Sequence, residues 1–207
     1  MVLRAVHGRP DVLWIAAYDD ATYHAQSYLV LHPKGNLLID VPPYQLDVIR
    51  AIQRRGGVQY IFITHKDDIG AAASFHEFFQ ARIIIHKSEA RYVQGIEVEV
   101  PFEGDFMLNS DIAIVHLPGH TPGSSALLDL RPPGVLFIGD ALNINPQGQL
   151  FVPPHPWDFD PVLKRVVLRK LLQYDFELIL PAHPPEPGRY VSERGRELLE
   201  QLLRRIL

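Results

Sequence analysis

The stretch "LPGHTPGSS", residues 117–125, places His120 in a loop rich in glycine and proline that follows the apolar run "IAIVHL". A buried strand fixes the position of its last residues, and the loop behind it exposes their side chains, so chemistry is expected at such strand ends. Three more apolar runs end in the same way, with Thr64, His65, Asp67 and Asp68 after "YIFI", Asp140 in "VLFIGDAL" and His183 in "LILPAHPPEPG". A single histidine of this kind is usually satisfied by local hydrogen bonds, but several polar strand ends together indicate a site.

The residue types at these strand ends are those that bind divalent metal ions. Imidazole nitrogens and carboxylate oxygens each offer a lone pair, and the carboxylates offset the charge of the ion. The residues expected as metal ligands are His65, Asp67, Asp68, His120, Asp140 and His183. The chain has no cysteine, so cysteine-based zinc sites, disulfides and thiolate nucleophiles are excluded. It also has no G-x-S-x-G elbow and no Walker or dinucleotide-binding glycine pattern.

The composition is that of a globular chain with a full core. Of its 207 residues 47% are hydrophobic and 21% charged, which fits one domain. The formal net charge of −4 is spread along the chain without a basic stripe, so neither nucleic acid nor a membrane surface is expected as a partner. The apolar patch at residues 12–17 is too short to cross a bilayer, and we expect it to form a strand in a cytoplasmic protein.

The first half of the chain alternates strand and helix patterns. The runs at 26–31 and 37–41 predict a hairpin, and helical spacing follows from Leu46 to Arg55, ending at a Gly-Gly pair. The apolar runs "VQYIFI" and "ARIIIH", with a helix over 71–80 between them, indicate a βαβ unit.

The second half begins with short strands. The segments "GIEVEV", "DFMLN", "DIAIVHL", "SALLDL" and "GVLFIG" predict an antiparallel meander. Asp160 and Pro161 are a good cap and first-turn pair for a helix that runs to Gln173, and the strand "FELIL" and an amphipathic helix over 192–207 complete the chain. No internal repeat and no long linker divides it.

Taken in order, the polar strand ends resemble the motifs of the metallo-β-lactamase-fold superfamily. That family has an Asp ending an early strand, then T-H-x-H-x-D-H, a G-H-T-x-G-S loop, an Asp in G-D and a late His. Here "LLIDVP" supplies Asp40, "PGHTPGS" supplies His120, "FIGDAL" supplies Asp140 and "LPAHPP" supplies His183. The resemblance implies an α/β fold, a four-layer αββα sandwich of two mixed β-sheets flanked by helices, formed by residues 1–207 as a single domain with the site along one edge.

The segment "THKDDIG" departs from this pattern, because only His65 matches a family ligand there. Asp67 stands at the second His position, Ile69 at the Asp position and Gly70 at the last His position. One interpretation is a single ion held by His65, His120 and Asp140, with Asp67 or His183 completing the shell. A second is a rearranged metal pair in which Asp67 and Asp68 turn inward and favour iron or manganese over zinc. A third is a scaffold without metal, in which Asp67 or Asp68 caps the next helix.

The resemblance implies a metal-dependent hydrolase of a small ester, thioester or lactone, with an incomplete second metal site. We expect one divalent ion, zinc in the first place and iron or manganese as alternatives. The ion would lower the pKa of its bound water toward about 7, and the hydroxide would attack the carbonyl while Asp140 or Asp67 takes the proton. The alternative function is that of a metal-poor, non-catalytic binding protein on the same scaffold. The sequence does not predict an oligomeric state.

Other polar residues are expected to be structural. His76 and His116 fit hydrogen-bonding positions, and Lys66 fits an exposed, solvated lysine. The loop "FVPPHPWDF" contains His155, which could wall a substrate pocket. Trp157 and Phe159 of the same loop are expected to close the core over the next helix, with a pocket wall as the alternative.

Overall fold

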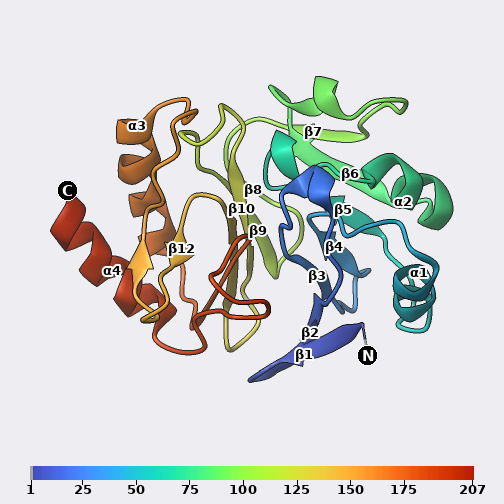
Figure 1. Ribbon diagram of the computed structural model, residues 1–207, viewed down its shortest axis with the longest axis horizontal. Helices are drawn as coiled ribbons and strands as arrows, with labels where there is room; N and C mark the ends of the chain where they lie inside the picture. Colours follow the sequence, from blue (N-terminus) through green and yellow to red (C-terminus); the bar gives the residue numbers. More distant parts are fainter. Residues whose placement is uncertain (1) are drawn as a thin grey trace. The chain divides into compact units, whose positions relative to one another are not determined.

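A computed structural model describes residues 2–207 of the chain. The chain divides into two compact units, Met1–Phe102 and Glu103–Leu207. Each unit contains a mixed β-sheet together with helices that belong to the same unit (Figure 1). The prediction of two mixed sheets with helices is therefore confirmed, whereas the single domain over residues 1–207 stays a prediction.

The first unit is built on a seven-stranded sheet in the order β1-β2-β3-β4-β5-β6-β7. Its strands are β1 (Leu3–Val6), β2 (Arg9–Ile15), β3 (Ser27–Val30), β4 (Leu37–Ile39), β5 (Tyr60–Phe62), β6 (Arg82–His86) and β7 (Val100–Phe102). Strands β1 to β4 are antiparallel neighbours, and β4 to β7 run parallel. Parallel strands need a crossover, which α1 (Leu46–Gln53) supplies between β4 and β5 and α2 (Ala72–Phe79) between β5 and β6. Three short 3-10 helices complete the unit, η1 (Asp20–Thr22), η2 (Lys66–Asp68) and η3 (Ala90–Tyr92).

The predicted hairpin of β3 and β4 is confirmed, and the side chain of Asn36 explains its position in the unit. Its Oδ1 accepts from the His32 amide, which closes the turn. Its Nδ2 donates to the carbonyls of Arg55 and Gly57, both at 2.9 Å. One amide therefore joins the hairpin turn to the end of α1.

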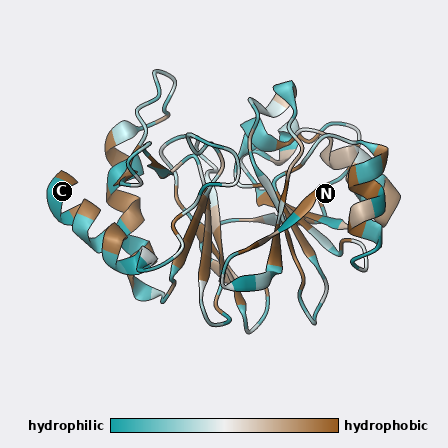
Figure 2. Cartoon of the chain, turned by 60° about the horizontal axis from the view of Figure 1, so that its bottom comes forward, coloured by the Kyte–Doolittle hydropathy of each residue, from teal (hydrophilic) through white to brown (hydrophobic). Residues whose placement is uncertain are grey.

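The core of the first unit lies between its sheet and its two helices. Figure 2 shows hydrophobic residues concentrated in the strands, while the helices carry hydrophilic and hydrophobic bands, as amphipathic helices do. The buried residues that form this core include Leu38, Ile61, Ile63, Ile83 and Ile85 from the strands and loops and Val48, Ile52 and Phe75 from the helices. Burying a side chain of this size contributes about 1.5–3 kcal/mol. This packing holds the strand ends that carry the polar residues.

One predicted strand is wrong. The segment "GIEVEV", residues 95–100, was expected to begin the antiparallel meander, but only Val100 is in a strand, and β7 pairs in parallel with β6. The reason lies in Glu99, whose carboxylate accepts from the Ile83 amide at 3.1 Å. A side chain thereby takes the place of a strand backbone beside the start of β6. The short strand β7 then contains Pro101 at its centre.

The second unit is built on a five-stranded sheet in the order β14-β11-β10-β9-β8. Its strands are β8 (Phe106–Met107), β9 (Ile112–His116), β10 (Ser125–Asp129), β11 (Val135–Gly139) and β14 (Leu178–Pro181). Strands β8 to β11 form the predicted antiparallel meander, and β14 runs parallel to β11. A separate hairpin of β12 (Asn143–Ile144) and β13 (Leu150–Phe151) was not predicted.

The helices of the second unit begin and end close to their predicted positions. Asp160 caps α3 (Pro161–Val166) by accepting from the amides of Val162 and Leu163 at 3.0 and 2.8 Å. The 3-10 helix η4 (Val167–Gln173) continues it to the predicted end, and α4 (Gly195–Ile206) follows β14. Within residues 2–207 no helix combines the length and the apolar character needed to cross a membrane.

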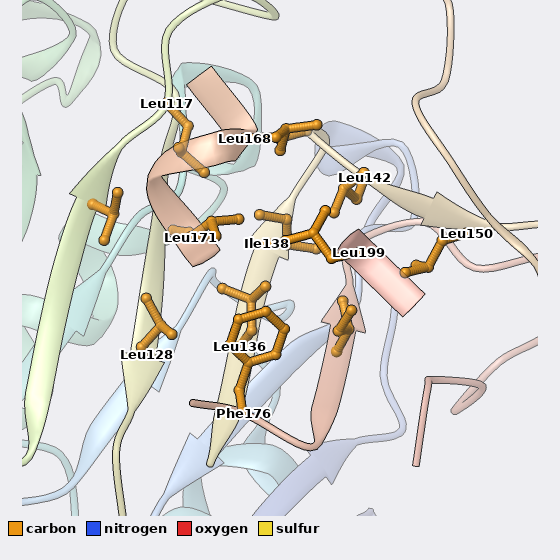
Figure 3. Close-up of a cluster of buried hydrophobic side chains, with 14 of the residues drawn as sticks. Leu117, Leu128, Leu136, Ile138, Leu142, Leu150, Leu168, Leu171, Phe176 and Leu199 are labelled. Carbon is orange, nitrogen blue, oxygen red and sulfur yellow. The ribbon is translucent and has the colours of Figure 1, made fainter. Parts of the chain in front are cut away.

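The core of the second unit fills the space between η4, α4 and the sheet (Figure 3). Leu136 and Ile138 alternate along β11 and point to the same face, as the period of two requires. They meet Leu168 and Leu171 of η4 and Leu199 of α4, all of them fully buried. This packing fixes the end of β11, where Asp140 follows.

Candidate metal centre

Asp40 ties the end of β4 to the loop after β5 in the first unit. It is buried, and its Oδ1 accepts from the Thr64 amide at 2.8 Å. The Thr64 hydroxyl donates to the other carboxylate oxygen at 3.1 Å. Asp40, the early aspartate of the family motif, therefore binds the backbone and side chain of Thr64 and so positions the next residue, His65.

That residue is His65, a buried histidine with an extended backbone. Because the Thr64 hydroxyl donates to Asp40, its oxygen is left to accept from His65 Nδ1, 3.0 Å away. The ring then presents Nε2 as an electron-pair donor. Nε2 lies 3.8 Å from Asp67 Oδ2, and Nδ1 lies 3.5 Å from Asp68 Oδ2.

The two aspartates of η2 have different surroundings. Asp68 is fully buried beside His65, whereas Asp67 is partly exposed and pairs with Lys66 Nζ at 2.6 Å. Partial burial lowers the pKa of Lys66, but the hydrogen bond and charge of Asp67 outweigh it, so that the pKa is raised. Lys66 is thus ion-paired, which corrects the expectation of a solvated lysine. Neither aspartate caps α2, whose cap position is Ala71 without a side-chain hydrogen bond.

Ile69 and Gly70 stand at two positions where the family motif has metal ligands, and both have structural roles in this chain. Gly70 has φ +46°, and a Cβ there would lie 3.0 Å from Thr22 Cγ2 and 3.3 Å from the Val41 carbonyl oxygen. A histidine at this position would therefore meet both backbone strain and a steric clash. Ile69 packs against the apolar core of the first unit. The loop is built around an apolar residue and a glycine, not around two further ligands.

In the second unit, His120 follows β9 and is buried. Its Nδ1 lies 2.8 Å from Asp158 Oδ1 and its Nε2 3.5 Å from Asp140 Oδ2. Thr121 and Ser124 hold the loop, since the Thr121 amide donates to the Ser124 hydroxyl at 2.9 Å. The two ring nitrogens of His120 therefore face two different carboxylates.

Asp140 lies between two histidines of the second unit. Its Oδ1 is 3.5 Å from His183 Nε2, and its Oδ2 is 3.5 Å from His120 Nε2. Asp140 and His183 follow β11 and β14, which are parallel neighbours, so their carboxyl-terminal ends meet at one edge of the sheet.

The spacing of these atoms fits a metal ion. Two ligand atoms that each lie 2.0–2.2 Å from a tetrahedral ion are about 3.3–3.6 Å apart. Both separations at Asp140, 3.5 Å each, fall in that range and are long for a hydrogen bond. The nitrogen and oxygen donors are also the types that zinc, iron and manganese bind. The residues present in the second unit therefore fit a divalent ion.

Asp158 and Lys164 are functional candidates that the sequence did not reveal. Both side chains are buried, and Lys164 Nζ lies 3.0 Å from Asp158 Oδ1. Burial raises the pKa of Asp158, but hydrogen bonds from His120 and Lys164 outweigh it and lower that pKa overall. Burial lowers the pKa of Lys164, partly offset by Asp158.

A sequence signal for Lys164 did exist. Lys164 stands three and four positions before Val167 and Leu168, both buried, and therefore lies on the inner face of the helix. Its counter-ion could not be found in this way, because Asp158 belongs to an irregular loop.

The same loop corrects the expectation for the aromatic residues. Trp157 and Phe159 are 68% and 60% exposed and do not close the core. Asp158 is the residue between them that turns inward, so its neighbours on both sides turn outward. The His155 ring lies 4.8 Å from the His120 ring and 5.6 Å from Trp157, between centroids. Burial lowers the pKa of His155, and the charge of Lys164 adds to that effect.

Two histidines expected to be structural are confirmed in that role. His76 Nδ1 lies 2.8 Å from the Ala81 carbonyl oxygen. His116 Nε2 lies 2.8 Å from the Pro122 carbonyl oxygen. The first unit thus brings together Asp40, His65, Asp67 and Asp68, and the second brings together His120, Asp140 and His183. That both sets bind one ion stays a prediction.

Comparison with known proteins relates the chain to one family. The family model described as "Metallo-beta-lactamase superfamily" matches residues 22–183. The uncharacterized protein YobT of Bacillus subtilis (strain 168) is 26% identical over 161 residues, 65% of this chain and 69% of that protein.

Solved structures show the same fold. A metallo-beta-lactamase with a HARLDQ motif from Cronobacter sakazakii has a TM-score of 0.69 at 15% identity, over 99% of this chain and 91% of that one. An archaeal protein of the superfamily, ST1585 from Sulfolobus tokodaii, has a TM-score of 0.62 at 16% identity, over 94% and 85%. TTHA1623 in a di-iron-bound form has a TM-score of 0.65 at 24% identity, over 86% and 93%. These likenesses confirm the predicted fold class.

Proposed function

Because the chain belongs to the metallo-beta-lactamase superfamily, we propose that it is a metal-dependent hydrolase of a small ester, thioester or lactone. One observation carries the proposal: each carboxylate oxygen of Asp140 lies 3.5 Å from a histidine Nε2, the spacing of atoms that share an ion.

The proposed ligands come from both units. His65, with Asp67 or Asp68, would join His120, Asp140 and His183 on one divalent ion. The order of the motifs along residues 22–183 supports this grouping. Zinc is the first candidate because imidazole nitrogen suits it, while the several carboxylates make iron and manganese reasonable alternatives. The di-iron form of TTHA1623 supports iron as an alternative.

A divalent ion supplies Lewis acidity and makes bound water acidic at neutral pH. The chain's own residues then have separate tasks. Asp158 orients His120, with its Oδ1 2.8 Å from Nδ1. Asp140, whose two oxygens face histidines, or Asp67, which lies beside His65 and Lys66, would accept the proton. The ammonium of Lys66, 2.6 Å from Asp67, keeps that carboxylate oriented.

The surroundings of His120 support the proposed substrate class. The exposed rings of Trp157 and Phe159 offer an apolar surface to an acyl or aryl group, and His155 lies between Trp157 and His120. We further propose a small-molecule substrate in the cytoplasm and no nucleic-acid or membrane partner, since the net charge of −4 provides no basic surface for either.

Metal analysis and a hydrolysis panel test the proposal. The protein is loaded with zinc, manganese or iron and assayed on an aryl ester, a thioester, a lactone and a β-lactam, the last because several solved relatives are metallo-beta-lactamases. His120→Ala should abolish both metal retention and hydrolysis. His76→Ala is the matched control, because that ring lies 2.8 Å from the Ala81 carbonyl oxygen and 3.4 Å from Glu99 Oε1, and neither group belongs to the proposed ligand set. Equal effects of the two substitutions would mean that the ligand histidines are wrongly assigned.

His65→Ala tests the contribution of the first unit. It should weaken zinc binding as severely as His120→Ala does. Unchanged zinc affinity in His65→Ala would restrict the site to the second unit. The alternative of a non-catalytic binding protein would be supported if the wild type retained no metal and none of the three ions raised its thermal stability, since an ion that binds only the folded state must raise it.

A further inference from the structure

Three buried side chains of the second unit, His120, Asp158 and Lys164, contact one another in sequence, and His120 also faces Asp140. His120 and Lys164 are 2% and 1% exposed, and the side chain of Asp158 between them is 3% exposed. Asp158 Oδ1 lies 2.8 Å from His120 Nδ1 and 3.0 Å from Lys164 Nζ. A buried ammonium beside a buried carboxylate is weak evidence for stability, because the cost of desolvating both charges offsets their attraction. A role for the pair is therefore expected.

The contacts of Asp158 determine which nitrogen of His120 carries the proton. Its Oδ2 accepts from the His155 amide at 3.2 Å, and both oxygens lie within 3.4 Å of Lys164 Nζ. Surrounded by these donors, Asp158 is a carboxylate and can only accept hydrogen bonds. His120 must then donate from Nδ1, which leaves the lone pair on Nε2, the nitrogen that faces Asp140.

We propose that Asp158, held in place by Lys164, is a positioning residue that fixes His120 in the Nδ1–H tautomer and thereby sets the affinity of the site for a divalent ion. The claim about the affinity for a divalent ion rests on the proposed function, whereas the claim about the His120 tautomer does not. Carboxylate partners of metal-binding histidines commonly fix the ring and raise its basicity in this way.

The backbone around the pair is built to hold it. Lys164 Nζ donates to the Pro153 carbonyl oxygen at 2.8 Å, which anchors the start of the loop. The Phe159 amide donates to the His120 carbonyl oxygen at 3.0 Å, and the Asp160 amide donates to that of Gly119 at 2.9 Å. The loop carrying Asp158 is thus joined to Lys164 and to the loop carrying His120.

Asp158→Asn tests the proposal with a side chain of the same size. The amide oxygen of the asparagine would take the place of Oδ2 and accept from the His155 amide, which puts its NH₂ group at the position of Oδ1, facing His120 Nδ1. The ring would then have to carry its proton on Nε2 and would lose the lone pair offered to the ion. Asp160→Asn is the matched control, since Asp160 bonds the amides of Val162 and Leu163, a capping role that asparagine fills equally well.

Two readouts apply to each protein. Nitrogen-15 NMR of metal-free protein in alkaline buffer, where the ring is neutral, reports the tautomer of His120. The wild type and Asp160→Asn should carry the proton on Nδ1, and Asp158→Asn on Nε2. Zinc affinity, measured by competition with a chelator, should fall about 10–100-fold in Asp158→Asn and stay unchanged in Asp160→Asn.

The proposal is overturned if wild-type His120 carries its proton on Nε2, or if Asp158→Asn keeps both the wild-type tautomer and the wild-type zinc affinity. If no protein in the series binds zinc, the proposed function fails, and the NMR result alone decides the tautomer claim. If Asp158→Asn does not fold, D158N/K164M removes the buried ammonium together with its counter-ion. That double variant should lose the fixed Nδ1–H tautomer, and retention of it would overturn the proposal.

Discussion

Replacing Gly119 by alanine should destabilise the second unit far more than an ordinary loop substitution. Gly119 has φ +146°, a conformation essentially reserved for glycine. An added Cβ would lie 2.3 Å from Lys164 Cα and 2.4 Å from Lys164 N, where an ordinary contact is 3.4–4 Å. The obstacle is the backbone of α3, which cannot rotate away as a side chain could.

The expected magnitude has three parts. The disallowed φ costs about 1–3 kcal/mol. Relief of the clash requires α3 and the His120 loop to separate by about 1 Å, an overpacking change that costs about 1–3 kcal/mol. That separation also strains the 2.9 Å hydrogen bond from the Asp160 amide to the Gly119 carbonyl, which contributes about 1 kcal/mol. We therefore expect a loss of about 3–7 kcal/mol, a large share of the stability of a typical domain.

Gly104→Ala is the control, because Gly104 also has positive φ, +70°, but a Cβ there would meet nothing within 4 Å. It should cost only the backbone strain of about 1–2 kcal/mol. Urea denaturation measures the unfolding free energy of the wild type and both variants. The dependence of that free energy on urea concentration is compared among the three proteins. If Gly119→Ala and Gly104→Ala lose equal free energy, the close approach of the His120 loop to α3 is refuted.

Two further outcomes follow from the geometry. After dialysis against metal-free buffer, elemental analysis should find at most one equivalent of metal per chain, because Ile69 and Gly70 supply no ligand; two retained equivalents would favour a second position built on Asp67 and Asp68. Burial and the charge of Asp105 raise the pKa of Tyr174, so the folded state favours the neutral phenol. The neutral phenol therefore contributes its full stabilisation below pH 10.0, the ordinary pKa of tyrosine, and this contribution is lost as the pH rises through the folded-state pKa. Tyr174→Phe should weaken the alkaline loss of stability in unfolding titrations, and an unchanged pH profile would contradict the assignment.

The polar residues at the strand ends could be predicted from the sequence, because each directly follows an apolar run that predicts a strand. His120, Asp140 and His183 each follow an apolar run, and in the second unit each of the two histidines lies 3.5 Å from a carboxylate oxygen of Asp140. The apolar runs before Asp140 and His183 predict the strands β11 and β14, and the parallel pairing of these two strands is seen only in the structure.

The features that the sequence did not predict depend on irregular loops and on the contacts of single side chains. The loop carrying Asp158 has no period, and its contact with His120 spans 38 positions. An exposed Trp157 and an inward Asp158 run against the usual preference of these residue types. The segment at 95–100 alternates like a strand, but Glu99 uses its side chain for the bond that a strand would make with its backbone.

Strand β7 has a consequence for the behaviour of the protein in solution. It forms one edge of the first sheet and is only three residues long, Val100, Pro101 and Phe102. Open sheet edges are templates for pairing with another chain, and a proline in such a strand has no amide hydrogen to offer. The 3-residue length leaves room for few other bonds. The short length and the proline of β7 therefore disfavour the addition of a strand from another chain at this edge.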